Sequence, residues 1–201
     1  MIKSNRRYIC LLLSALVIIV ISGCKKESLT KEYFPNKTNV QWKYKTTDPA
    51  AYFLREFYGT SRINGTTYQN WIKTDFDTAG TQIFRETSYV IVTDTAVEIY
   101  EYPDSDPYIL LKLPLEEDST WSFEIDEEPI NALVEGKEND YTVEAGNYDD
   151  VYVVRYDDPE NEEIRRVYFA PNVGIIKDIW LDYDDFEPFL DEELIEYPVN
   201  D

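Results

Sequence analysis

The amino-acid sequence predicts an all-β protein with a mainly antiparallel sheet. From Val40 onward, runs rich in Val, Ile, Tyr, Thr, Phe and Trp recur at short intervals, separated by clusters of Gly, Pro, Asn and Asp. Asn64 and Gly65 lie between two such runs, and both residues accept the positive φ of a type I′ hairpin turn. No stretch shows a convincing helical spacing of apolar residues, and the best candidate, 186–196, contains Pro188.

The strand-like runs define the predicted elements. We expect strands at residues 40–46, 52–63, 66–74, 81–93, 96–102, 108–113, 120–126, 130–137, 141–145, 151–157, 163–170, 174–182 and 193–199. Both faces of 151–156 carry apolar bulk, so this strand should be covered on both sides. The run 163–168 mixes charge and bulk, which is typical of a half-exposed strand.

A targeting segment precedes the strands. Lys3, Arg6 and Arg7 supply a basic start. Residues 9–21 are almost wholly apolar but number only about 13, short of the ~20 that a membrane-spanning helix needs. We therefore interpret residues 1–23 as a cleaved signal peptide.

The end of this segment, Ile21-Ser22-Gly23-Cys24, resembles the bacterial lipobox. The resemblance implies that Cys24 becomes the lipidated first residue and anchors the chain to a membrane, with palmitate among its acyl groups. An ordinary secretory signal with an incidental Cys24, or an uncleaved anchor, is the alternative. Lys25 and Lys26 follow, and in the enterobacterial sorting rule lysine there favours the outer membrane. We expect a cell-envelope location, periplasmic or surface-facing.

Residues 24–33 are polar and predict a tether, and 34–201 predict a single β-rich domain. The chain carries 40 acidic and 19 basic residues, a net charge of −21, and the signal contains none of the acidic ones. Such a surface repels nucleic acid, so we expect no nucleic-acid partner. Cys10 lies in the signal and Cys24 carries lipid, which leaves no cysteine for a disulfide in the mature domain.

Histidine is absent, and this excludes Ser-His-Asp, Cys-His and histidine-based metal chemistry. We therefore predict neither an enzyme nor a cofactor. Paired carboxylates could still hydrolyse a glycan, but 40 acidic side chains make such a pair unspecific. The acidic runs 157–160 and 182–187 offer oxygen ligands for calcium, and a solvated acidic loop is the favoured alternative.

Aromatic residues are abundant, with 17 Tyr, nine Phe and four Trp, so some must lie at the surface. Exposed rings such as Tyr58, Tyr68 and Trp71 could stack on a sugar or seat an apolar ligand, although core packing is the favoured interpretation. We assign the other three tryptophans to the core: Trp42, Trp121 and Trp180.

An internal similarity links two segments. Phe34-Pro35 leads, seven residues after the proline, to Trp42, and Leu113-Pro114 leads at the same spacing to Trp121. Each tryptophan is followed two positions later by a second aromatic residue, which lies on the same face of a strand. A sheet of two similar halves is one interpretation, and two unrelated strand starts are the other.

The C-terminal half resembles a family of bacterial lipoproteins and exported β-sheet proteins to which no activity is assigned. The resemblance rests on the segments 142–148, 151–153 and 167–177, which match a Val-Pro-Ala-Gly-Thr-Phe segment, a strand, and a Tyr-Tyr-Ala-Pro-Gly-Val-Gly-Leu-Val-Lys segment. It implies a long, curved antiparallel sheet that is distantly similar to the open half-barrels of lipoprotein-localisation carriers. A sandwich is the alternative architecture for the predicted sheet. Glu144 and Asn172 replace the family's usual Pro and Gly, both in turns.

These observations favour a lipid-anchored envelope lipoprotein that acts as a non-catalytic binding or structural module, with an envelope protein or a glycan as its partner. A carrier of a lipid or another apolar molecule is the first alternative, and it predicts an apolar concavity lined by inward side chains. A hydrolase that uses only carboxylates is the second.

Overall fold

The computed structural model describes residues 32–47, 50–113, 115–125, 127–184 and 186–199. The signal peptide, Cys24 and the predicted tether up to residue 31 lie outside these ranges. Within the described residues, no helix has the length and apolarity that crossing a membrane requires.

The described part of the chain is built from strands. Their bounds are β1 (Gln41–Thr46), β2 (Tyr52–Ile63), β3 (Thr66–Phe76), β4 (Gln82–Val92), β5 (Ala96–Tyr100), β6 (Tyr108–Lys112), β7 (Thr120–Ile125), β8 (Glu128–Glu138), β9 (Tyr141–Val143), β10 (Gly146–Tyr148), β11 (Val151–Asp158), β12 (Glu163–Ala170), β13 (Gly174–Asp182) and β14 (Pro188–Glu196). The fold is therefore all-β, as predicted.

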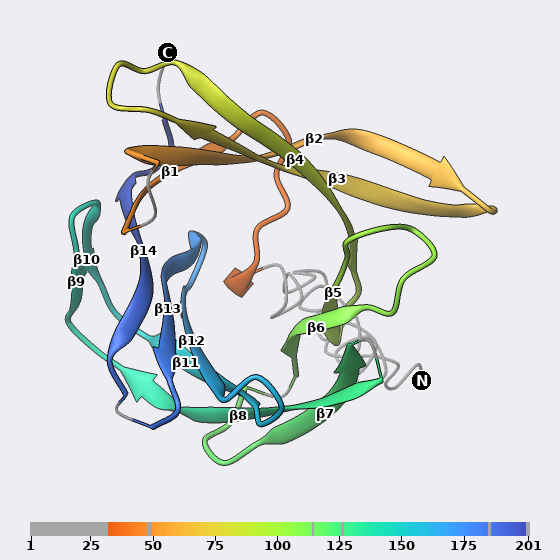
Figure 1. Cartoon of the computed structure of the whole chain (residues 1–201), viewed down its shortest axis with the longest axis vertical. Coiled ribbons are helices and arrows are strands. Elements are labelled where there is room, and N and C mark those ends of the chain that lie inside the picture. The colour runs from red at the N-terminus through yellow and green to blue at the C-terminus, as the bar shows by residue number, and fades with distance from the viewer. Residues whose placement is uncertain (1–31, 48–49, 114, 126, 185, 200–201) are drawn as a thin grey trace, which may run out of the picture.

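Twelve strands form one antiparallel sheet in the order β6-β5-β4-β3-β2-β1-β14-β13-β12-β11-β8-β7. Strands β1 to β6 make one meander, and β7, β8 and β11 to β14 make a second. The two meanders meet where β1 pairs with β14. The sheet curves almost completely round on itself, as the view in Figure 1 shows. The long curved sheet is thus confirmed, and it is more nearly closed than an open half-barrel.

Local sequence explains the tight turns. Asn64 and Gly65 have φ values of 50° and 86°, so both adopt the positive φ expected of the hairpin between β2 and β3. Between β12 and β13, Asn172 and Gly174 have φ values of 63° and 95°. Asn is a residue that tolerates this conformation, which explains how a residue other than glycine adopts a positive φ at position 172.

The inner face of the sheet carries the core. In β2 the inward residues are Phe53, Arg55 and Phe57, and both phenylalanines are fully buried. The ring of Phe53 stacks on Tyr44 of β1, with centroids 4.9 Å apart. Because side chains alternate along a strand, the large inward side chains of neighbouring strands pack against one another on the concave face of the sheet.

The hairpin β9-β10 covers part of the outer face. Tyr141 stacks on Tyr168 of β12 at 4.8 Å between ring centroids, and Val143 is buried. At the tip, the Ala145 amide donates to the carbonyl of Leu194. This cover explains why β11 is buried on both faces, as the sequence predicts.

Two elements differ from expectation. The last strand covers Pro188–Glu196, not 193–199, and it lies within the stretch 186–196, which is the best helical candidate by sequence. The Asp, Glu and Pro residues of this strand have low strand propensity. It forms a strand because β1 and β13 pair with it on both sides, and this pairing overrides the local propensity. The short strand β10 was not predicted, because its three residues Gly146–Tyr148 pair only with β9.

Trp180 and Tyr33 also depart from the predicted pattern. Trp42 and Trp121 are buried as expected, but Trp180 is only half-buried and lies beside the exposed ring of Phe189. Tyr33, the last residue of the predicted tether, is buried and packs edge-on against Tyr152 at 5.2 Å. The packed domain therefore begins before residue 34.

Candidate functional site

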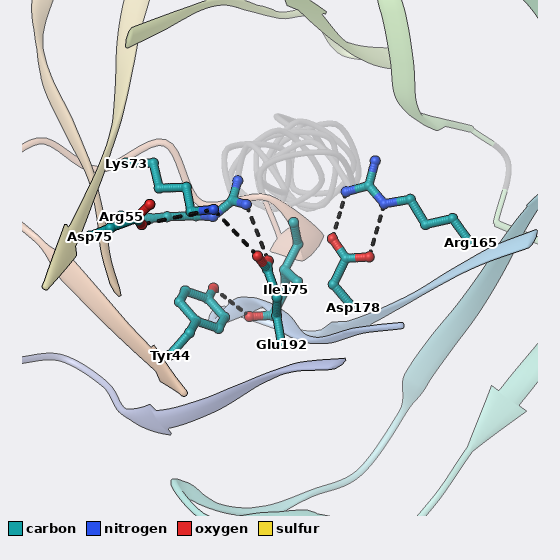
Figure 2. A network of polar contacts seen from close by, with 8 residues as sticks. All are labelled: Tyr44, Arg55, Lys73, Asp75, Arg165, Ile175, Asp178 and Glu192. Carbon is teal, nitrogen blue, oxygen red and sulfur yellow. Dashed lines mark hydrogen bonds and ion pairs between the residues drawn. The ribbon is translucent and has the colours of Figure 1, made fainter. Parts of the chain in front are cut away.

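Charged side chains meet inside the curve of the sheet. Six of them form what we call the interior ion-pair network, shown in Figure 2: Arg55, Lys73, Asp75, Arg165, Asp178 and Glu192. They come from β2, β3, β12, β13 and β14, which are brought together by the curvature of the sheet. Charged groups in a protein interior are costly unless they are paired, so their pairing decides what this site can do.

One cluster of the network centres on Glu192. Its carboxylate lies 3.3 Å from the Arg55 guanidinium and 3.5 Å from the Lys73 ammonium. Arg55 and Lys73 are placed side by side by the register of β2 and β3. Lys73 also lies 3.8 Å from Asp75 Oδ1, which is too long for a hydrogen bond, and that oxygen has no other hydrogen-bond partner within the described part of the chain.

The second cluster is a bidentate pair. The Nε of Arg165 donates to Asp178 Oδ1 at 2.9 Å, and its Nη2 donates to Oδ2 at 2.6 Å. The guanidinium also lies 5.0 Å from the ring centroid of Trp180 and 5.2 Å from that of Tyr108. Planar pairing and aromatic stacking are properties of arginine that lysine lacks, so this position selects arginine.

The network has three cations and three carboxylates and is therefore formally neutral. Burial raises the pKa of Glu192, and the neighbouring Asp178 adds to this rise, while Arg55 and Lys73 oppose it. Burial also raises the pKa of Tyr44, whose hydroxyl donates to the Ile175 carbonyl at 2.8 Å. Tyr44 thus stays protonated and acts as a hydrogen-bond donor.

The interior beside the Glu192 cluster is aromatic and filled. Phe34 lies edge-on to Phe57 and Trp71, with ring centroids 5.7 Å and 5.4 Å away. Trp42 lies edge-on to Phe57 at 6.2 Å. The cavity among these rings measures about 10 Å³, which has room for about one water molecule. No acyl chain fits there.

Two larger grooves lie on the surface at the open side of the sheet, between β6 and β7. One, of about 380 Å³, runs between Asp106, Ile109, Ser122 and Glu124. The other, of about 340 Å³, also includes Asp106 and is lined in addition by Glu101. Neither groove has a lysine or an arginine in its lining.

The network offers little for acid–base or nucleophilic chemistry. Asp178 is held at both oxygens by Arg165, and Glu192 is shared by two cations. A nucleophile needs an adjacent base that is free to take its proton, and the paired carboxylates here are engaged. Asp178 and Glu192 are thus engaged by cations of the protein itself, and among the network's described carboxylate oxygens only Asp75 Oδ1 is buried without a hydrogen bond.

The residues singled out from the sequence differ in whether the structure describes them and in how exposed they are. Cys24 lies outside the described residues. Tyr58 is 60% exposed, as expected of a surface ring. Tyr68 and Trp71 are buried, so they are not exposed rings that could stack on a sugar, and the favoured interpretation of core packing holds for both.

In the two acidic runs, several aspartate carboxylates accept hydrogen bonds from nearby residues of the chain. Asp157 accepts two hydrogen bonds from Arg155, each of 2.7 Å, and Asp158 accepts from the Asn161 amide. Asp182 accepts from the Asp184 amide at 2.8 Å. Within the ranges that the structure describes, no group of three or more potential ligands is arranged to hold a metal ion.

Sequence reasoning did not single out the network, although a signal exists. In β2, Arg55 stands between Phe53 and Phe57 on the inward face, and in β3 Lys73 follows Trp71 by two positions. A charge in phase with large buried aromatic residues indicates an inward charge, which requires a partner. The partner itself, more than a hundred residues away, has no local signature.

One comparison with known proteins supports the fold. No protein-family model matches the chain, and no curated protein sequence matches it. The crystal structure of a predicted exported protein with a YmcC-like fold from Bacteroides fragilis is similar, with a TM-score of 0.54 and 12% identity, over 82% of this chain and 98% of that one. A predicted lipoprotein from Parabacteroides distasonis gives a TM-score of 0.47 and 14% identity, over 82% and 97% of the two chains. The fold is therefore similar to the YmcC-like one.

Proposed function

We propose that this chain is a bacterial envelope lipoprotein, anchored to a membrane by lipid on Cys24, whose sheet acts as a non-catalytic binding or structural module. The observation that carries the proposal is the sequence Ile21-Ser22-Gly23-Cys24 directly after a short apolar segment. The YmcC-like fold, which occurs in a predicted exported protein, supports it. So does the resemblance of segments 142–148 and 167–177 to a family of lipoproteins and exported β-sheet proteins.

The membrane proposed is the outer one. Lys25 and Lys26 follow the lipidated cysteine, and neither is the aspartate that retains enterobacterial lipoproteins at the inner membrane. Stable attachment requires more than one acyl chain, which a fully processed lipoprotein cysteine carries. The domain begins near Tyr33, so only a few residues separate it from the bilayer.

The non-catalytic role is supported by the state of the inward charges. Each ion pair of the interior network is made between side chains of the protein itself, as described above. Many tyrosines and phenylalanines of the described chain also pack in the core, as Tyr44 does against Phe53. Interaction through the sheet edge, the loops or the outer face is then the role that remains for the domain.

Neither alternative is favoured by a specific observation. A lipid carrier requires an apolar concavity, whereas the interior combines a filled aromatic cluster around Phe34 with charged groups such as Arg165 and Asp178. A carboxylate hydrolase requires an available acid and base, whereas Glu192 and Asp178 are engaged by cations. Mass spectrometry of solvent extracts should find no non-covalent lipid, and a panel of glycans should give no turnover.

The anchor is tested by metabolic labelling with radioactive palmitate. Cys24→Ala should abolish incorporation of label and release the protein from the membrane fraction. Cys10→Ala, in the apolar part of the signal, is the matched control and should be labelled as the wild type is. Labelling of the Cys24→Ala protein, or membrane association that survives the change, contradicts the proposal.

A further inference from the structure

The two edges of the sheet face each other but are not equivalent. Strands β6 and β7 are consecutive in the chain, yet they end the sheet at opposite sides of its strand order. Within the described residues, every other pair of consecutive strands in the twelve-stranded sheet is joined by backbone hydrogen bonds, whereas β6 and β7 are not. Closure therefore stops at this seam.

The edge of β6 is covered by side chains. The indole of Trp121 on β7 donates to the Ile109 carbonyl at 3.1 Å, and the hydroxyl of Tyr156 on β11 donates to the Leu110 carbonyl. Tyr108 packs edge-on against Phe123 of β7, with centroids 4.9 Å apart. In Figure 1, β6 lies on the inner side of β7, in agreement with these contacts. Covering an edge in this way protects it from pairing with another chain.

The edge of β7 is free. The Val134 amide donates to the Ser119 carbonyl at 2.9 Å, and the register then continues from Thr120 opposite Leu133. Because backbone groups alternate sides in an antiparallel pair, those of Thr120, Ser122 and Glu124 point away from β8. All three residues are exposed, and no other strand of the described chain pairs with this side.

The surroundings of this edge are acidic. The groove of about 380 Å³ lies between Ser122 and Glu124 on β7 and Asp106 before β6. The adjoining groove adds Glu101 and Asp104. Phe123 and Ile109 line the first groove with apolar surface. An extended chain laid here meets free backbone donors and acceptors, an apolar wall and a rim of carboxylates.

We propose that the free edge of β7 accepts an extended, lysine- or arginine-containing segment of another polypeptide as an added strand. Backbone hydrogen bonds to Thr120, Ser122 and Glu124 would supply affinity, and basic side chains beside Asp106 and Glu124 would supply specificity. A second copy of this chain is disfavoured as the occupant, because the groove is acidic and the protein carries a net charge of −21. The inference rests on the proposed role as a binding module and names the chemistry of its partner.

The test measures hydrogen exchange by mass spectrometry on the full lipidated protein in detergent micelles. The probes are a short peptide in which lysine and valine alternate and a matched peptide with glutamate in place of lysine. The lysine peptide should slow amide exchange in fragments that contain Thr120–Ile125 by about tenfold, because it supplies acceptors to free amides. The glutamate peptide should leave exchange unchanged.

Two pairs of variants sharpen the test. Ser122→Pro removes the outward N–H without breaking a bond to β8 and should abolish the protection, whereas Ser122→Ala keeps the N–H and should retain it. Should the proline variant not fold, Asp106→Lys combined with Glu124→Lys leaves the backbone intact and should transfer the preference to the glutamate peptide.

Equal protection by both peptides, or protection confined to other strands, would overturn the proposal. Sedimentation that shows self-association lost in Ser122→Pro would overturn it in favour of a second copy as the occupant. The palmitate experiment is independent of these outcomes, so failure of strand addition and failure of the lipid anchor are distinguished.

Discussion

The two halves of the twelve-stranded sheet, β1–β6 on one side and β7, β8 and β11–β14 on the other, begin with segments that can be compared residue by residue. In the first, Asn39 has a φ of 61° and precedes Trp42, whose indole donates to the Val173 carbonyl at 2.7 Å. In the second, Asp118 has a φ of 67° and precedes Trp121, whose indole donates to the Ile109 carbonyl at 3.1 Å. A positive-φ residue three positions before an indole donor thus occurs in both.

The use of the two tryptophans differs. Strand β1 is paired on both sides, and Trp42 lies within the aromatic core, stacked on Tyr197 with centroids 5.5 Å apart. Strand β7 is paired on one side, and Trp121 covers the edge of β6. The same local arrangement can therefore fill a closed core or seal a seam, and tertiary context determines which.

The ion pairs differ in the same way. Arg165 and Asp178 belong to neighbouring strands of the second half, whereas Glu192 joins that half to Arg55 and Lys73 of the first. One cluster stabilises a half internally, and the other stabilises the junction between halves.

The largest effect should come from the pair within the second half. Asp178→Asn leaves the Arg165 guanidinium buried without its carboxylate and should lower the free energy of unfolding by about 3–5 kcal/mol. Urea unfolding followed by tryptophan fluorescence measures it, with Asp184→Asn in an exposed turn as the control. Replacing both partners by Met and Leu should recover most of the loss, and a double variant as unstable as the single one would contradict the assignment.

The next largest effects should come from substitution of Trp42 and Trp121, which should differ in their effect on β6. Trp42→Phe and Trp121→Phe each lose a buried hydrogen bond and ring surface, and should each lower the free energy of unfolding by about 1–3 kcal/mol. Only Trp121→Phe should speed amide exchange in β6, because it removes a hydrogen bond that ties β6 to β7 and so lowers the free energy of local opening of β6. Faster exchange of β6 in both variants would remove the distinction between core and seam.

The cluster of Glu192 with Arg55 and Lys73, which joins the two halves, should make the free energy of unfolding depend on pH. The pKa of Glu192 is raised above its ordinary value of 4.5, chiefly by burial, so the folded state holds this proton to higher pH than the unfolded state does. The contribution of Glu192 to stability is then greatest below pH 4.5 and falls as pH rises through the raised pKa. The slope cannot exceed about 1.4 kcal/mol per pH unit for one proton.

The wild type and Glu192→Gln, unfolded in urea from acid to neutral pH, test this dependence. The difference in unfolding free energy, wild type minus variant, should fall as pH rises. A difference that grows with pH would mean that ion pairing with Arg55 and Lys73 outweighs burial at this site.

The smallest effect concerns the strand starts. Asn39→Ala and Asp118→Ala place a residue that disfavours positive φ at both positions, and each should lower the free energy of unfolding by about 1 kcal/mol. Asn39→Gly and Asp118→Gly, which tolerate this conformation, should be nearly neutral. Unequal losses in the two alanine variants would show that the two starts are similar in sequence but not in local strain.

The sequence predicted most strands because strand formation and tight turns are read locally. Asn64 and Gly65 determined a turn, and apolar bulk on both faces of 151–156 predicted β11 as a strand covered on both sides. The exceptions had weak local signals. Strand β14 forms from residues that favour other structures, since two neighbours pair with it, and β10 is too short to show a period.

By itself, the sequence determined the all-β class, the acidic surface, the lack of histidine chemistry and the proposal that Cys24 carries lipid. Only the tertiary structure decided that β1 pairs with β14, that Glu192 meets Arg55, and that β6 is covered while β7 is free. The physical reason is separation along the chain. Arg55 and Glu192 are 137 residues apart, and a contact of that range depends on the curvature and order of the whole sheet rather than on any local pattern.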